Sequence, residues 1–72
     1  MTMEGDLQEL RDALDSREWE NPSSWQIWAR EGRDVGFEDY TTFRDDALET
    51  LEQKGVIDQK GYNSVGRKTY EI

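Results

Sequence analysis

The segment ALETLEQKGVIDQ, residues 47–59, most constrains the fold, because it shows where a helix ends and an extended chain begins. Thr42 is the expected N-cap of this helix, with the acidic Asp45 three positions later. Gly55 stands where helices commonly end in a left-handed glycine, and Val56 is then expected to contact the last turn in a Schellman-type closure. The apolar face predicted by the helical period comprises Phe43, Ala47, Leu48 and Leu51.

A β-hairpin is predicted after this glycine. Residues 56–60 open a short strand, residues 61–66 have the glycine, asparagine and serine content of a turn, and residues 67–72 form the returning strand. Side chains alternate between the two faces of a strand, so Tyr70 and Ile72 are expected to face the core. Tyr62, at the tip of the loop, is expected either to reach a groove as an aromatic of the hairpin or to fold back on the sheet, and the second placement is slightly favoured.

A first helix is predicted over about residues 6–16. Leu7, Leu10 and Leu14 recur at helical spacing and form one apolar stripe. A polar connection follows, in which Trp19 is the expected anchor to the core. The N-terminal helix should therefore pack through its leucines.

A second helix is predicted next, and two starts compete. Asn21 is a good N-cap with Pro22 at the first helical position, whereas Ser23 as N-cap forms a capping box with Gln26. The helix should stop at or just after Gly32.

Aromatic residues of this region are assigned to the core. Trp25, Trp28 and Ala29 are expected to share one face of the second helix, and a core role is favoured over a base-stacking platform. Val35 and Phe37 are expected to tuck into the core from the following connection.

Composition limits the chemistry of the domain. A chain of 72 residues, 33% of them hydrophobic, can build one small core but no deep pocket. There is no cysteine and no histidine, which removes the commonest metal ligand and the commonest general base near neutral pH. We therefore expect no enzyme activity, no catalytic residue, no metal site and no cofactor.

No apolar run is long enough to cross a bilayer, so no membrane association is expected. The first residues, MTMEGD, are acidic and polar, unlike a secretory signal, and a cytoplasmic protein is the expectation.

Acidic residues number 17 against 9 basic ones, for a net charge of -8. Acid excess with few lysines and few large aliphatic residues resembles the composition of halophilic proteins, whose surface repulsion is screened at high salt. An ordinary acidic surface that aids solubility is the alternative. The sequence leaves both interpretations open.

The predicted order of three helices and a C-terminal hairpin resembles the winged helix-turn-helix superfamily. The resemblance is carried by residues 47–59 and by GRKTYEI, residues 66–72. It implies an α+β fold, a small three-helix domain with a C-terminal β-hairpin that spans residues 1–72. The connection between the second and third helices, REGRDVGFEDYTT, is longer than the usual tight turn.

The resemblance also implies binding of double-stranded DNA, as in a small transcriptional regulator. The third helix would lie in the major groove, and the predicted hairpin, called the wing in this superfamily, would lie along the DNA backbone. A homodimer is a further expectation, because one module of this size makes a small interface. The DNA-binding residues that the resemblance implies are Thr41, Thr42, Arg44, Lys60, Asn63, Arg67 and Lys68.

The distribution of charge along the chain limits which part of it can bind DNA. Residues 1–54 hold 15 acidic and 6 basic side chains, whereas residues 55–72 hold 2 acidic and 3 basic. Phosphate neutralisation usually dominates DNA affinity, so the hairpin is the part of the chain best suited to it. The more common role of cations such as Lys60, Arg67 and Lys68 is that of solvated hairpin charges, which keep a strand edge from aggregating. The alternative is a protein-interaction module without DNA binding, whose acidic third helix docks a basic protein partner.

Overall fold

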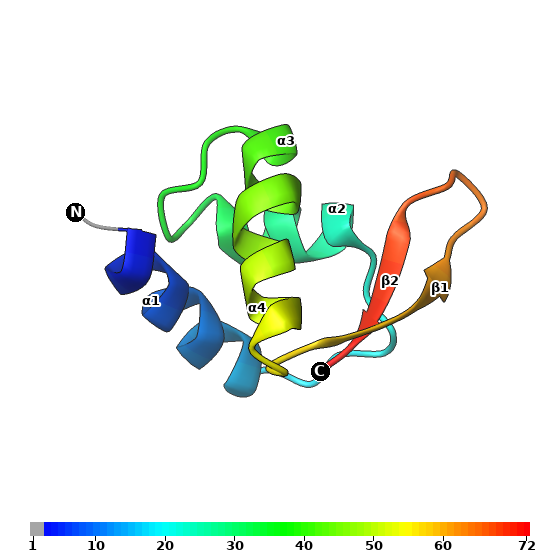
Figure 1. The fold of residues 1–72 in the computed structure, drawn as a ribbon, viewed down its shortest axis with the longest axis horizontal. Helices are drawn as coiled ribbons and strands as arrows, with labels where there is room; N and C mark the ends of the chain where they lie inside the picture. Colours follow the sequence, from blue (N-terminus) through cyan, green and yellow to red (C-terminus); the bar gives the residue numbers. More distant parts are fainter. Residues whose placement is uncertain (1–2) are drawn as a thin grey trace.

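Three helical segments precede a two-stranded antiparallel hairpin in the computed structural model, which describes residues 3–72 (Figure 1). The predicted α+β architecture and order of elements are thereby confirmed. The elements in chain order are α1 (Met3–Asp15), α2 (Ser24–Ile27), the π-helical η1 (Trp28–Gly32), α3 (Tyr40–Thr42), the π-helical η2 (Phe43–Leu48), α4 (Glu49–Gln53), β1 (Asp58–Tyr62) and β2 (Lys68–Glu71).

One core joins the helices to the hairpin. Figure 1 shows α1 and the hairpin on opposite sides of the continuous helical segment formed by residues 40–53. The leucine stripe predicted for α1 is confirmed, and Val35, Phe37 and Trp19 pack against the core as expected. The buried hydrophobic residues are Leu7, Leu10, Leu14, Ile27, Phe43, Ala47, Leu48, Leu51, Ile57 and Tyr70.

The second helical segment begins at the later of its two predicted starts. Ser23 Oγ accepts a hydrogen bond from the Gln26 backbone N–H, and Gln26 Oε1 accepts from the Ser23 N–H at 2.9 Å, which completes the capping box. Asn21 is not the cap. Its φ of 44° places it in the left-handed region, which asparagine tolerates better than most residues.

The buried face of α2 differs from the predicted one. Ser24 and Ile27 are fully buried, whereas Trp25 keeps 42% of its surface exposed. Residues two positions apart differ by about 200° around a helix, so Trp25 and Ile27 cannot share a face. The assignment of Trp25 to the core was therefore wrong, and Trp28 is only partly buried.

The third helical segment begins earlier than predicted. Asp39, not Thr42, is the N-cap, and its carboxylate accepts hydrogen bonds from both the backbone N–H and the hydroxyl of Thr42, each at 2.8 Å. The connection before it, residues 33–39, is longer than a tight helix-turn-helix turn.

The predicted closure at Gly55 is confirmed. Gly55 has a φ of 76°, and its N–H donates to the Glu52 carbonyl at 3.1 Å. The N–H of Val56 donates to the Leu51 carbonyl at 3.0 Å, which completes a Schellman motif. This motif sets the direction in which the chain leaves α4 for the hairpin.

The hairpin pairs β1 with β2, with a bulge between Gln59 and Gly61. Tyr70 is buried as predicted, but Ile72 is exposed, so its expected core position was wrong. A bridge between Ser23 and Thr69 ties β2 to the segment before α2, and the Tyr70 N–H donates to the Pro22 carbonyl at 2.9 Å. Among the described residues, no helix is both long enough and apolar enough to cross a bilayer.

Candidate nucleic-acid interface

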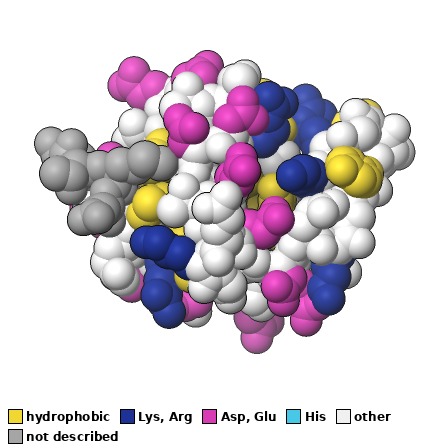
Figure 2. Space-filling view, in the orientation of Figure 1, with side chains coloured by type: hydrophobic (Ala, Val, Ile, Leu, Met, Phe, Trp, Pro, Cys, Tyr) yellow, Lys and Arg dark blue, Asp and Glu magenta, His cyan; other side chains and the backbone are white. Residues whose placement is uncertain are grey.

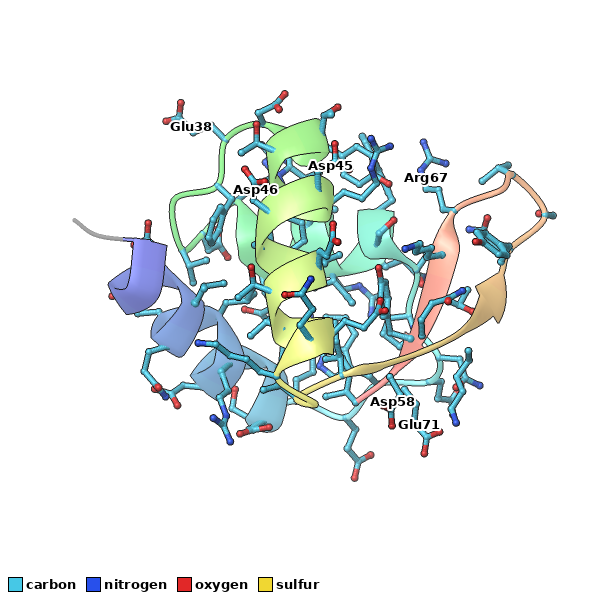
Figure 3. The ribbon with its side chains drawn as sticks, in the orientation of Figure 1. Glu38, Asp45, Asp46, Asp58, Arg67 and Glu71 are labelled. Carbon is cyan, nitrogen blue, oxygen red and sulfur yellow. The ribbon has the colours of Figure 1, made fainter. Side chains whose placement is uncertain are left out.

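A groove of about 220 Å³ lies between the third helical segment and the hairpin. We call it the helix–hairpin groove. Figure 3 places Asp45 on its helical side and Arg67 on its hairpin side. The groove is lined by Tyr40, Arg44, Asp45, Glu49, Glu52, Tyr62, Gly66, Arg67, Lys68 and Tyr70.

Three of the residues predicted to bind DNA meet at this groove. Arg44 comes from η2, whereas Arg67 directly precedes β2 and Lys68 is its first residue. We call these three side chains the cationic rim. Figure 2 shows dark-blue side chains gathered where the helical segment faces the hairpin.

Arg67 is held against two aromatic rings. Its guanidinium carbon lies 5.0 Å from the centre of the Trp25 ring and 5.8 Å from that of Tyr40. The Tyr40 hydroxyl is in turn hydrogen-bonded to Ser24 Oγ at 2.7 Å. Cation–π contacts of this kind hold the guanidinium in place while leaving its N–H groups able to donate.

The aromatic support is a cluster of three rings from two helical segments. Trp25 lies 5.0 Å from both Trp28 and Tyr40 between ring centres, in tilted or edge-to-face geometry. Trp28 is fixed from behind by a hydrogen bond of 2.8 Å from its Nε1–H to the Phe37 carbonyl. Trp25 is not among the site residues predicted from the sequence, because its helical spacing from Trp28 indicates a shared buried face.

The guanidinium of Arg44 is hydrogen-bonded to the adjacent Asp45. Its Nε–H donates to Asp45 Oδ1 at 2.8 Å, and Nη2 donates to Oδ2 at 3.3 Å. This hydrogen bonding lowers the pKa of the Asp45 carboxyl, and the nearby charge of Lys68 acts in the same direction. A phosphate that approaches Arg44 must therefore share it with a carboxylate.

Acidic side chains balance the rim. Asp45, Glu49 and Glu52 line the same groove, so its walls carry as many carboxylates as cations. Figure 2 shows magenta side chains along the face of the third helical segment. The arrangement permits contacts between the cationic rim and the phosphate backbone of a nucleic acid. The carboxylates oppose close approach of phosphates to the third helical segment.

The other predicted site residues lie outside the helix–hairpin groove. Lys60 Nζ forms an ion pair of 2.8 Å with Glu71. Asn63 organises the hairpin turn, because its Oδ1 accepts from the backbone N–H groups of Val65 and Arg67. Thr41 and Thr42 are exposed on the first turn of the third helical segment, where Thr42 is engaged by the N-cap.

Tyr62 lines the helix–hairpin groove with 67% of its surface exposed, which agrees with the first of its two expected placements, whereas the favoured one, folded back on the sheet, was wrong. Within residues 3–72 no cluster of carboxylates is arranged to hold a metal ion. Comparisons with models of protein families, with curated proteins and with solved structures find no match to this chain.

Proposed function

We propose that the chain is a small winged-helix-like protein that binds double-stranded DNA, acting as a cytoplasmic regulator of transcription. The observation that carries this proposal is the convergence of Arg44, Arg67 and Lys68 on one groove from two segments far apart in the sequence. Clustered cations of this kind neutralise phosphates, which is the main source of affinity for a nucleic-acid backbone.

The hairpin side of the groove suits this role better than the helical side. Arg67 is already ordered by its contacts with Trp25 and Tyr40, so little side-chain entropy is lost when it contacts a phosphate. The carboxylates of Asp45 and Glu49 on the helical side repel the phosphates of a DNA backbone. The proposed complex therefore depends on the wing for affinity, with little base reading by the third helical segment.

A titration of labelled duplex DNA at several salt concentrations tests the proposal. The double variant Arg44→Ala/Lys68→Ala should weaken binding and lower the salt slope by roughly 0.9 for each phosphate that is no longer neutralised. The matched control is Arg11→Ala/Lys54→Ala, which removes the same charge from a different surface, at α1 and the end of α4. Equal effects of the two double variants, or no duplex binding at any salt concentration, would overturn the proposal.

A second function is favoured by one specific observation, the row of carboxylates on the third helical segment. Asp45, Asp46 and Glu49 are exposed along it, and Figure 3 shows Asp45 and Asp46 on this element. Such a face complements a basic protein partner. Backbone amide shifts on addition of an arginine-rich peptide, centred on residues 45–52 and absent with duplex DNA, would support this alternative.

A further inference from the structure

A second groove, of about 340 Å³, also has Arg67 in its lining. We call it the amide groove. It is lined by Asn21, Ser23, Trp25, Gln26, Asn63, Arg67 and Thr69. No carboxylate is among these lining residues, although the chain carries a net charge of -8. The amide groove therefore lacks the acidic wall that opposes phosphate in the helix–hairpin groove.

Two carboxamides present hydrogen-bond donors along this groove. Gln26 Oε1 accepts from the Ser23 backbone N–H at 2.9 Å, which fixes the orientation of the amide. Asn63 Oδ1 is fixed in the same way, by the N–H groups of Val65 and Arg67 at 3.1 and 2.9 Å. Because each carbonyl oxygen is held by the backbone, the NH₂ groups remain as donors for a ligand.

An exposed indole completes the groove. Trp25 is 42% exposed, yet its ring is fixed by contacts with Trp28 and Tyr40. Arg67 lies over the ring and supplies positive charge at the same place. An exposed aromatic ring together with an arginine is the combination that stacks unpaired bases and holds the adjoining phosphate.

We propose that the amide groove binds an unpaired nucleotide of single-stranded DNA. The base stacks on the part of the Trp25 ring that Arg67 leaves exposed, and oxygen acceptors of the base or its phosphate receive hydrogen bonds from Gln26, Asn63 and Arg67. This activity goes beyond duplex binding, because among the described residues the linings of the two grooves have no member in common except Arg67. It also accounts for a solvent-exposed tryptophan that the core does not use.

Titration with a short single-stranded oligothymidylate tests the proposal. We expect quenching of tryptophan fluorescence, together with shifts of the side-chain NH₂ resonances of Gln26 and Asn63. Trp25→Ala should remove the quenching and weaken binding about tenfold or more, the effect typical of losing one stacked base. An abasic oligonucleotide of the same length should bind more weakly, because it cannot stack.

Gln26→Glu is the sharpest variant. Glutamate at this position keeps the capping box, because its carboxylate still accepts from the Ser23 N–H. It replaces the NH₂ donor with a negative charge, so we expect about a tenfold loss of oligothymidylate affinity with unchanged unfolding by urea. Gln53→Glu is the control, since it makes the same charge change at the end of α4, away from the amide groove.

Three results would overturn the proposal. They are equal oligothymidylate affinity of the Gln26→Glu and Gln53→Glu variants, equal affinity for abasic and oligothymidylate strands, and shifts confined to the helix–hairpin groove. Arg44 and Lys68 do not line the amide groove, so the duplex titration of the Arg44→Ala/Lys68→Ala variant is read independently. Loss of single-strand binding and loss of duplex binding can therefore be told apart.

Discussion

The guanidinium of Arg67 lies 5.0 Å from the centre of the Trp25 ring, which joins the hairpin to the first turn of α2. Arg67→Lys keeps the charge but loses the planar group that stacks on the indole. We expect the free energy of unfolding to fall by about 0.5–1 kcal/mol, measured by urea denaturation. Lys60→Arg is the control, because it also keeps its charge. A larger loss in the control than in Arg67→Lys would contradict this account.

The capping box of α2 predicts different stabilities for the variants Ser23→Ala and Gln26→Glu. Ser23→Ala removes the hydroxyl that accepts from the Gln26 N–H and should lower the free energy of unfolding by about 1 kcal/mol. Gln26→Glu, which keeps both hydrogen bonds, should be close to neutral. Thermal unfolding followed by circular dichroism compares the two, and equal losses would exclude a capping role for Ser23.

Glycine substitutions separate backbone strain from steric conflict. Gly55 has a φ of 76°, and apart from its chain neighbours no atom of the described residues lies within 4 Å of an added Cβ, so Gly55→Ala should cost about 1–2 kcal/mol through backbone conformation alone. Gly61, whose φ is not positive and whose added Cβ would come no closer than 3.9 Å to Thr69 Oγ1, is the control. Chemical denaturation of Gly61→Ala should show little or no loss.

Gly32→Ala should destabilise the fold for a different reason. A Cβ there would lie 2.7 Å from Cε1 of the buried Phe43 ring, which forces η1 and η2 apart. We expect a loss of about 1–3 kcal/mol, typical of overpacking. The double variant Gly32→Ala/Phe43→Leu should recover part of the overpacking loss, and a strictly additive double variant would argue against this contact as the cause.

Alkaline pH should destabilise the protein through Tyr70. Burial raises the pKa of the Tyr70 hydroxyl from 10.0 to about 12, with the charge of Glu52 a smaller cause in the same direction. A folded-state pKa above the unfolded value means that the stabilisation is complete below pH 10 and is lost as pH rises toward about 12. Tyr70→Phe should show a smaller fall in unfolding free energy over this range, measured by urea denaturation at each pH.

Acid should act through the N-cap of the third helical segment. The backbone hydrogen bond from Thr42 is the main cause that lowers the pKa of the Asp39 carboxyl below 3.8, and the Thr42 hydroxyl adds to it. Its stabilisation is present above about pH 4 and is lost as pH falls through the lowered pKa. Asp39→Asn keeps a capping side chain, so its stability should depend less on pH below 4. Identical acid unfolding curves would count against this role.

Local patterns in the sequence predicted much of this fold. The spacing of Leu7, Leu10 and Leu14 and the glycine at position 55 each encode a feature that depends on near neighbours. Burial of Ile27 in place of Trp25 depends on how α2 turns toward the rest of the core, which helical period alone does not specify. Asp39 and Thr42 are both good capping types three positions apart, and either satisfies the local rule.

The candidate site was less predictable. Arg67 and Lys68 of the cationic rim could be anticipated from the charge contrast between the two parts of the chain, whereas Arg44 lies in the acidic part and was predicted only by the resemblance to winged helices. The ion pair of Lys60 with Glu71 and the turn role of Asn63 depend on the register of the hairpin, which includes a bulge. The contact of Arg67 with Trp25 joins distant segments and follows only from the packed fold.

The bridge between Ser23 and Thr69 has a consequence for how the protein folds. It joins the segment before α2 to a strand made much later, so this contact closes a loop that contains most of the chain. Contacts of large sequence separation form slowly, because loop entropy is lost before they stabilise anything. Before β2 is synthesised, Pro22 and Ser23 lack their backbone partners Tyr70 and Thr69, so a ribosome that pauses there holds a chain in which neither the hairpin nor this bridge has formed.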